Sequence, residues 1–223
     1  MKPYYTDDLV TLYHGDCLEI DAWLAADVLV TDPPYGIGWR RGENRARASR
    51  RHEGIANDGD TAARDTMLTA WGDRPGVVFG SLYAPFPPNR QILVWQKPGD
   101  SGVVGSTTGY RRDTEAVFLV GEWPQRSARW SSVLRSATAN IGTPNSPAGR
   151  TGHPHAKPID LMESLILSAP PGVIADPFAG SGSTLVAAKR LGRRAIGVEL
   201  EERYCEVIAR RLSQGVLDFG DAS

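Results

Sequence analysis

The sequence predicts an α/β fold built on a mostly parallel, doubly wound sheet. Short, continuous apolar runs at 28–31 and 173–175 are typical of strands that are buried on both faces. These runs alternate with segments whose apolar residues recur at helical spacing, an order that favours parallel strands joined by helices. A turn with an acidic residue follows each of the two runs. In open sheets of this kind, ligands bind at the edge where the strands end.

Each element follows from local pattern. We predict strands at 9–13, 28–31, 77–79, 92–95, 116–120, 173–175 and 195–200, and helices at 17–26, 62–71, 158–169, 183–191 and 202–212. Pro158 suits the first position of the helix at 158–169, and Gly192 ends the helix at 183–191. Two stretches, 38–60 and 121–152, are polar and lack periodicity, so we interpret the first as a mobile loop and the second as an irregular insert.

Composition narrows the class of protein. The chain has 223 residues, of which 41% are hydrophobic and 23% charged, and we expect a single domain over 1–223. No apolar run has the length of a membrane span, and the N-terminus lacks a signal-peptide core. Two cysteines without metal-ligand spacing indicate a reducing cytoplasm and no metal site. The net charge of −1 argues only weakly against a nucleic-acid partner, because residues 40–52 concentrate six arginines against one acid.

The second turn has the layout of a cofactor loop. A strand leads into Asp176-Pro177-Phe178-Ala179-Gly180-Ser181-Gly182-Ser183 and then into a helix. Glycines let the backbone approach a ligand, and the helix N-terminus offers free N–H groups. Glu199 ends the next strand, where a carboxylate accepts hydrogen bonds from ribose hydroxyls. An acid at 176 would repel a pyrophosphate, so a cofactor with cationic groups fits better than a dinucleotide.

The first turn, Asp32-Pro33-Pro34-Tyr35, suits chemistry on an aromatic amine. The exocyclic amine of adenine or cytosine is a poor nucleophile, because its lone pair is delocalised into the ring. A site that methylates it must accept its protons with fixed oxygens. The Asp32 carboxylate and the Pro33 carbonyl are two such acceptors, and the prolines stiffen the turn. Tyr35 offers a face on which an extruded base stacks.

Together these motifs resemble the amino-methyltransferases of DNA, which carry (D/N/S)PP(Y/F) and F-x-G-x-G. With the catalytic motif first, the chain is similar to the circularly permuted β group. The resemblance implies a Rossmann-like methyltransferase fold and S-adenosylmethionine as cofactor. It places Asp16 on the cofactor's adenine, Glu199 on its ribose, and Lys157, from His153-Pro154-His155-Ala156-Lys157-Pro158, near its methionine end. It also implies that the loop residues Asp176, Phe178, Gly180, Ser181, Gly182 and Ser183 bind the cofactor. His155-Ala156 and Ser183 depart slightly from the usual Thr-Gln and Thr.

DNA is the expected partner, and arginines in the two irregular stretches are the candidate contacts. We predict that Arg45, Arg47, Arg50 and Arg51 in the 38–60 loop bind phosphates. The resemblance assigns 121–152 to target recognition, where Arg126 and Arg129, with Arg135, Trp123 and Trp130, supply phosphate contacts and stacking.

The leading hypothesis is methylation of the N6 amine of adenine in DNA, because Asp at position 32 favours adenine and Ser there would favour cytosine. The N4 amine of cytosine needs the same chemistry and stays open, as does an RNA amine. Methylation at C5 of cytosine requires a thiolate in a Pro-Cys turn, which Cys17 and Cys205 do not provide. A dinucleotide oxidoreductase is opposed by Asp176, and a non-catalytic DNA-binding protein by two intact motifs. The sequence leaves a homodimer open.

Overall fold

The computed structural model describes residues 1–38, 58–99, 109–125, 127, 129–137, 151 and 156–214. The strands are β1 Tyr5–Thr6, β2 Val10–His14, β3 Val28–Thr31, β4 Gly76–Gly80, β5 Gln91–Gln96, β6 Thr114–Val120, β7 Val133–Arg135, β8 Ile174–Asp176 and β9 Ala195–Glu199. The helices are α1 Ala62–Trp71, α3 Ile159–Ser168, α4 Ser183–Arg190 and α5 Glu202–Ser213, with a 3₁₀ turn, η1, at Ala22–Ala25.

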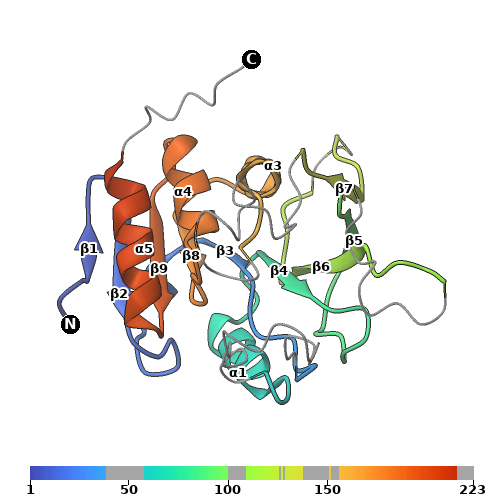
Figure 1. Cartoon of the computed structure of the whole chain (residues 1–223), viewed down its shortest axis with the longest axis horizontal. Helices are drawn as coiled ribbons and strands as arrows, with labels where there is room; N and C mark the ends of the chain where they lie inside the picture. The colour runs from blue at the N-terminus through green and yellow to red at the C-terminus, as the bar shows by residue number, and fades with distance from the viewer. Residues whose placement is uncertain are drawn as a thin grey trace, which may run out of the picture.

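The described strands form one sheet in the order β1-β2-β9-β8-β3-β4-β6-β5-β7. The five neighbouring strands β2, β9, β8, β3 and β4 are parallel to one another. Strand β6 runs antiparallel to both of its neighbours, β4 and β5 (Figure 1). The predicted α/β fold with a mostly parallel sheet is confirmed. Sequence order and sheet order differ most at β3, which lies between β8 and β4 although it comes early in the chain. The two motif-bearing strands, β3 and β8, are therefore direct neighbours.

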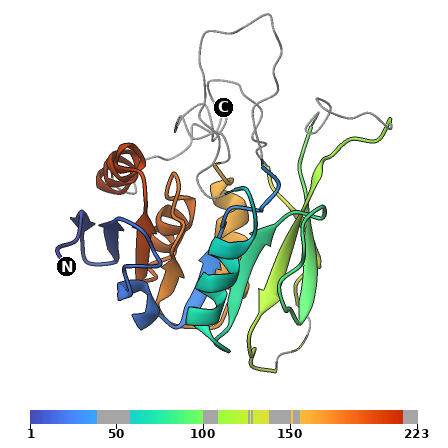
Figure 2. The same cartoon turned by 90° about the horizontal axis from the view of Figure 1, so that it is seen from below.

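Helices cover both faces of the sheet (Figure 2). On one face, α3, α4 and α5 pack against apolar side chains such as Val30, Val77 and Val117. On the other face, η1 and α1 pack against Leu29, Val78 and their neighbours. Consecutive residues of β3 point to opposite faces and all are buried, which explains its continuous apolar run. Among the described residues, no helix combines the length and apolar content needed to cross a membrane.

Three sequence expectations need correction. The helix predicted at 17–26 is a single turn followed by η1, because the buried Trp23 indole donates a 3.0 Å hydrogen bond to the Cys17 carbonyl. A continuous helix would bond that carbonyl to the backbone N–H four residues on. The 121–152 stretch contains a strand, β7, which pairs in parallel with β5. The two-residue β1 pairs with β2 and has no counterpart among the predicted strands.

One edge of the sheet carries the polar residues of the candidate site. The parallel strands β2, β9, β8, β3 and β4 all end there, and so does β5. Because β6 is antiparallel to its neighbours, it begins at this edge rather than ending at it. The first residues of β6 consequently lie beside the turn that follows β3.

Candidate active site

The Asp32–Tyr35 turn begins at the end of β3. Thr31 is fully buried, and both prolines are buried behind it. Gly36 ends the turn with a φ of +73°, and a Cβ there would lie 2.6 Å from the backbone carbonyl carbon of Asp60. Glycine is therefore required at this position, since the positive φ and the close approach both oppose a side chain. The Gly36 N–H donates to Asp58 Oδ1 at 2.9 Å, which fixes the turn to the segment before α1.

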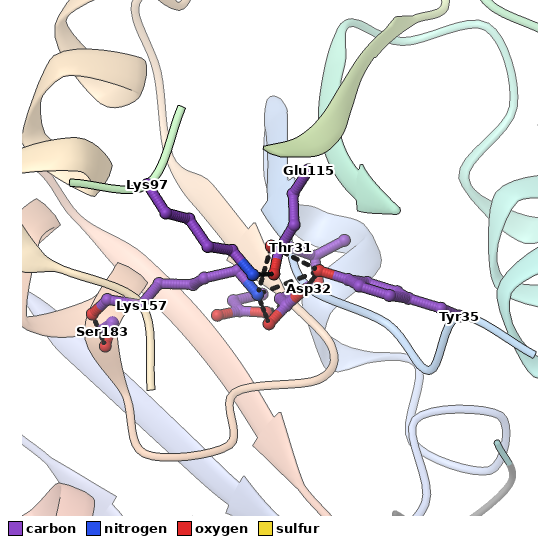
Figure 3. A network of polar contacts seen from close by, with 8 residues as sticks. Thr31, Asp32, Tyr35, Lys97, Glu115, Lys157 and Ser183 are labelled. Atoms are coloured by element: carbon purple, nitrogen blue, oxygen red, sulfur yellow. Dashed lines mark hydrogen bonds and ion pairs between the residues drawn. The ribbon is translucent and has the colours of Figure 1, made fainter. Parts of the chain in front are cut away.

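Both oxygens of the Asp32 carboxylate accept hydrogen bonds. The Tyr35 hydroxyl donates to Oδ1 at 2.7 Å, and the Lys157 ammonium donates to Oδ2 at 2.6 Å. Lys157 also donates to the Tyr35 hydroxyl oxygen at 3.0 Å. In Figure 3 the lysines enter this cluster from one side and Tyr35 from the other. The tyrosine ring is thus held by its hydroxyl, in a fixed orientation beside the carboxylate.

Two further members of the cluster, Glu115 and Lys97, were not among the predicted site residues. Glu115 Oε2 lies 3.2 Å from the Tyr35 hydroxyl oxygen, as the longer alternative acceptor of its single proton, and 3.3 Å from Lys157 Nζ. Its Oε1 is 2.5 Å from the Lys97 ammonium. A sequence signal was available. Alternation along β5 and β6 puts Lys97 in line with buried Trp95 and Glu115 in line with buried Val117, so opposite charges share one face of the hairpin.

Burial and neighbouring charge give the two carboxylates different proton affinities. Burial raises the pKa of Asp32, and the nearby Glu115 carboxylate raises it further, although Lys157 opposes both. Burial would also raise the pKa of Glu115, but Lys157 and Lys97 together lower it to about 2. The pKa of Lys157 is raised by Asp32 and Glu115 against the effect of its burial. Glu115 therefore stays ionised, while Asp32 is the more basic carboxylate.

The glycine-rich loop lies beside this cluster, between β8 and α4. Asp176 ends β8 with its carboxylate turned inward, where Oδ1 accepts hydrogen bonds from the Thr31 hydroxyl at 2.7 Å and the Phe178 N–H at 3.3 Å. Gly182 precedes α4 with a φ of +80°, and a Cβ there would lie 2.8 Å from Ile208 Cγ1. The Ser183 hydroxyl donates to the Lys157 carbonyl at 2.8 Å. Lys157 thus contacts the loop by its backbone and the Asp32–Tyr35 turn by its side chain.

Glu199 provides a carboxylate that fits a hydroxyl-rich ligand. Its side chain is buried, and it accepts hydrogen bonds from the Gly180 N–H at 2.6 Å and the Glu201 N–H at 2.8 Å. Burial raises its pKa to about 7. A carboxylate has about four lone-pair positions, so two remain for further donors such as ribose hydroxyls. Asp16 follows β2, and β2 pairs in register with β9, so Asp16 lies next to the end of β9 that carries Glu199.

The predicted DNA contacts lie mostly beyond the described part of the chain. Arg45, Arg47, Arg50, Arg51 and Arg126 are all outside the described residues, while Arg129 is described and exposed. Trp123 packs on the core and donates its indole N–H to the Val120 carbonyl at 2.9 Å, whereas Trp130 is 57% exposed. Of the two tryptophans expected to stack on bases, Trp130 is the more available.

An additional exposed aromatic group lies near the catalytic edge, in the loop after β4. Tyr83 is 69% exposed, and the Arg112 guanidinium lies 4.9 Å from the centroid of its ring. The end of β4 pairs with Ala116, the neighbour of Glu115, which places this loop beside the cluster. An exposed ring with a guanidinium over it is the kind of surface on which a nucleobase stacks.

Neither cysteine supplies a nucleophile. Cys17 and Cys205 are both buried and unpaired with each other. Burial raises the pKa of each thiol to about 12, with nearby carboxylates adding to the effect. Thiolate-dependent C5 methylation of cytosine is thus disfavoured by the structure as well as by the sequence.

The fold and the two loop motifs at one sheet edge define an α/β methyltransferase architecture. A family model described as DNA methylase, covering the N6 and N4 methyltransferases, matches residues 94–210, more than half of the chain. The Type II methyltransferase M2.LlaDCHI of Lactococcus lactis subsp. cremoris is 45% identical, over 96% of this chain and 93% of its own. The chain belongs to this family of DNA methyltransferases. Lys97, Glu115, Lys157 and Glu199 all lie within the matched range.

Solved structures show the same fold. The M1.HpyAVI complex with S-adenosylmethionine aligns with a TM-score of 0.61 at 21% identity, over 92% of this chain and 99% of that one. The cytosine-N4-specific PvuII DNA methyltransferase aligns with a TM-score of 0.60 at 20% identity, over 94% of this chain and 88% of that one. At identities of 21% and 20%, these two structures show a shared fold and nothing finer.

Proposed function

We propose that this chain transfers a methyl group from S-adenosylmethionine to the N6 amine of adenine in DNA. The observation that carries the proposal is the position of the Asp32 carboxylate. It is the more basic of two paired carboxylates, lies at the carboxyl edge of the sheet, and is held beside an aromatic ring and next to a glycine-rich loop. An amine acceptor and a cofactor loop are thereby placed on adjacent strands.

The cofactor is S-adenosylmethionine, which supplies an electrophilic methyl group on a positively charged sulfur. Glu199 accepts the ribose hydroxyls with its two remaining lone-pair positions, and Asp16, which follows β2 beside the end of β9, accepts from the adenine amine. The loop from Phe178 to Gly182 surrounds the methionine portion.

Catalysis then rests on the catalytic turn. The target amine donates its two N–H groups to the Asp32 carboxylate and the Pro33 carbonyl, while the base stacks on the Tyr35 ring. These acceptors favour the tetrahedral nitrogen, whose lone pair attacks the methyl carbon as the carbon–sulfur bond breaks. One amine proton passes to Asp32 and is released to solvent, since the Asp32 side chain is 23% exposed.

The choice of adenine over cytosine rests on the aspartate at position 32. A carboxylate is a stronger hydrogen-bond acceptor than a serine hydroxyl, which suits the less acidic N6 amine. Transfer to the N4 amine of cytosine uses the same geometry and is the alternative. The Type II name of the Lactococcus relative supports a place for this chain in restriction and modification.

DNA contacts surround the catalytic edge. The segment between Gly38 and Asp58 carries the arginine cluster, and its two ends are joined by a 2.7 Å hydrogen bond from the Gly38 N–H to the Asp58 carbonyl. We propose that these arginines contact the phosphates that flank the extruded base. Tyr83 with Arg112 forms a second contact surface, and residues 121–152 read the target sequence.

Mass analysis of nucleosides tests the proposal. The chain is expressed in a host that lacks its own DNA methyltransferases, and the genomic DNA is digested to nucleosides. N6-methyladenine is expected, and it should be absent when the Asp32→Ala variant is expressed at the same level. N4-methylcytosine would establish the alternative, and neither product with correctly folded protein would refute both.

A further inference from the structure

The structure presents Asp32 with both of its carboxylate oxygens already engaged. Tyr35 donates to Oδ1 at 2.7 Å, and Lys157 donates to Oδ2 at 2.6 Å. In the proposed reaction the same carboxylate must accept an amine N–H and then a proton. An ammonium hydrogen-bonded to it makes the carboxylate a weaker base, because the positive charge stabilises its ionised form. Lys157 must therefore move its charge from Asp32 toward another anion as the amine binds.

Glu115 is the anion in position to receive that charge. Its Oε2 is 3.3 Å from Lys157 Nζ and 3.2 Å from the Tyr35 hydroxyl, so it contacts both groups that engage Asp32. The Glu115 side chain is only 15% exposed and is held from the far side by Lys97 at 2.5 Å. Lys157, at 7% exposed, lies between the two carboxylates and needs to move little to exchange one for the other.

We propose that Glu115 is a positioning residue, which draws Lys157 and the Tyr35 hydroxyl away from Asp32 when the target amine binds. This inference rests on the proposed amine methylation. The charges balance at each stage. Before reaction, two carboxylates face two ammonium groups. After one amine proton passes to Asp32, Glu115 alone faces Lys157 and Lys97, until the proton leaves Asp32 for solvent.

The charged groups around Asp32 determine how its titration responds to substitution. Lys157 precedes α3, Glu115 lies on β6, and Lys97, which follows β5, reaches the carboxylate through Glu115. Asp176, at the end of β8, lies behind Thr31. Glu115 is kept ionised by its two lysines, so its negative charge acts on Asp32 throughout the working pH range. Removing that charge lowers the pKa of Asp32, and removing the Lys97 charge raises it.

The test compares three variants of the full chain. Glu115→Gln removes the anion, and Lys97→Gln removes its far partner. Glu122→Gln makes the same chemical change at an exposed glutamate just past the other end of β6. The rate of methyl transfer in a single turnover is measured against pH, with S-adenosylmethionine and DNA both saturating. Calorimetry checks the cofactor affinity of each variant.

We expect Glu115→Gln to slow methyl transfer by about 10- to 100-fold. The acid limb of its profile of rate against pH, which reports the ionisation of Asp32, should shift down by about 1 pH unit. Lys97→Gln should shift the acid limb upward, and Glu122→Gln should match the wild type. Cofactor affinity should be unchanged in all three. A purely structural role would not shift the two limbs in opposite directions.

Other outcomes overturn one proposal or the other. Acid limbs that coincide, or that move in the same direction in both variants, would refute the role of Glu115. A folded wild type that methylates no DNA would instead refute the proposed function itself. If Glu115→Gln does not fold, Lys97→Gln decides alone, since an unshifted limb there also refutes the inference.

Discussion

The Thr31 hydroxyl donates a 2.7 Å hydrogen bond to Oδ1 of Asp176 and so joins the last residues of β3 and β8. The Asp32–Tyr35 turn starts one residue after Thr31, and the glycine-rich loop starts one residue after Asp176. This buried bond fixes the two loops relative to each other at their origins. The acceptor is a carboxylate held in the interior, which has a cost in stability that depends on pH.

Asp176→Asn should therefore stabilise the cofactor-free protein at neutral pH. Burial raises the pKa of Asp176 from 3.8 to about 6 in the folded state. The folded protein then binds a proton more readily than the unfolded chain, so the free energy of unfolding decreases as pH rises from about 4 to 6. Asn does not titrate, so the free energy of unfolding of Asp176→Asn relative to wild type should increase between pH 4 and 6. The difference should reach roughly 2 to 3 kcal/mol at pH 8.

Denaturant unfolding at pH 4, 6 and 8 checks this expectation. Asp8→Asn is a matched control, because Asp8 is exposed. A difference between wild type and Asp176→Asn that stays constant over this range would show that Asp176 titrates normally in the folded protein.

Asp32→Ala should abolish methyl transfer and leave cofactor affinity nearly unchanged. The carboxylate is needed mainly as the amine becomes tetrahedral, so its loss acts on the transition state, by at least about 100-fold in rate. Lys157 retains a partner in Glu115, 3.3 Å away, so the cluster does not leave a buried charge unpaired. Single-turnover assays and calorimetry measure the two quantities separately. Lost cofactor binding with normal turnover at saturation would mean that the role assigned to Asp32 is wrong.

Cofactor affinity should depend on pH through Glu199. The pKa of this carboxyl is raised to about 7 by burial, and only the ionised form accepts freely from ribose hydroxyls. Affinity should decrease below pH 7, by up to about tenfold per pH unit while the group is protonated in the free protein.

Glu199→Gln should weaken binding by about 10- to 100-fold and remove this pH dependence. The Gly180 and Glu201 N–H groups bond to different oxygens of Glu199, and glutamine replaces one of these with an NH2 donor, so one of the two bonds is lost and the loop should loosen. Calorimetry from pH 5.5 to 8.5 tests both effects, with the exposed Glu206→Gln as control. Unchanged affinity in Glu199→Gln would place the ribose elsewhere.

Local patterns predicted most of the fold because its central strands β3, β4 and β8 are buried on both faces. The bounds of β3 and α1 agree with the predicted ranges, and the other long elements differ by a residue or two at their ends. The failures have tertiary causes. The helix predicted at 17–26 is interrupted because Trp23 bonds the Cys17 carbonyl, a contact that no local propensity describes. The three-residue β7 is mostly exposed and is defined only by its pairing with β5.

The sequence predicted only part of the site, because the remaining residues come together through tertiary structure. Sequence motifs identify residues that are close in the chain, such as those from Asp32 to Tyr35. Glu115 joins the same cluster from a strand that is distant in sequence, and only the antiparallel insertion of β6 between β4 and β5 brings it there. Lys157 was assigned to the cofactor by resemblance, whereas its ammonium contacts Asp32 and Tyr35.

The arginine-rich segment provides the last prediction. Changing Arg45, Arg47, Arg50 and Arg51 together to Ser should weaken DNA binding and flatten its dependence on salt. Each lost phosphate contact reduces the slope of log affinity against log salt by about 0.9 on duplex DNA. The described residues at the two ends of this segment, Gly38 and Asp58, are joined by a hydrogen bond, and Asp58 also accepts from the Gly36 N–H beside the Asp32–Tyr35 turn.

The other properties of this variant separate phosphate contact from broader damage. Affinity for S-adenosylmethionine should be unchanged, because its proposed ligands are Glu199 at the end of β9 and the loop after β8, and neither is altered in this variant. Sequence preference should be largely retained, since phosphate contacts position a protein on DNA without reading bases. The slope is measured by titrating binding of a target duplex at several salt concentrations for the variant and the wild type. Equal slopes would mean that the segment does not contact phosphates, and the DNA would then have to be held by the surface around Tyr83 and Arg112 and by residues 121–152.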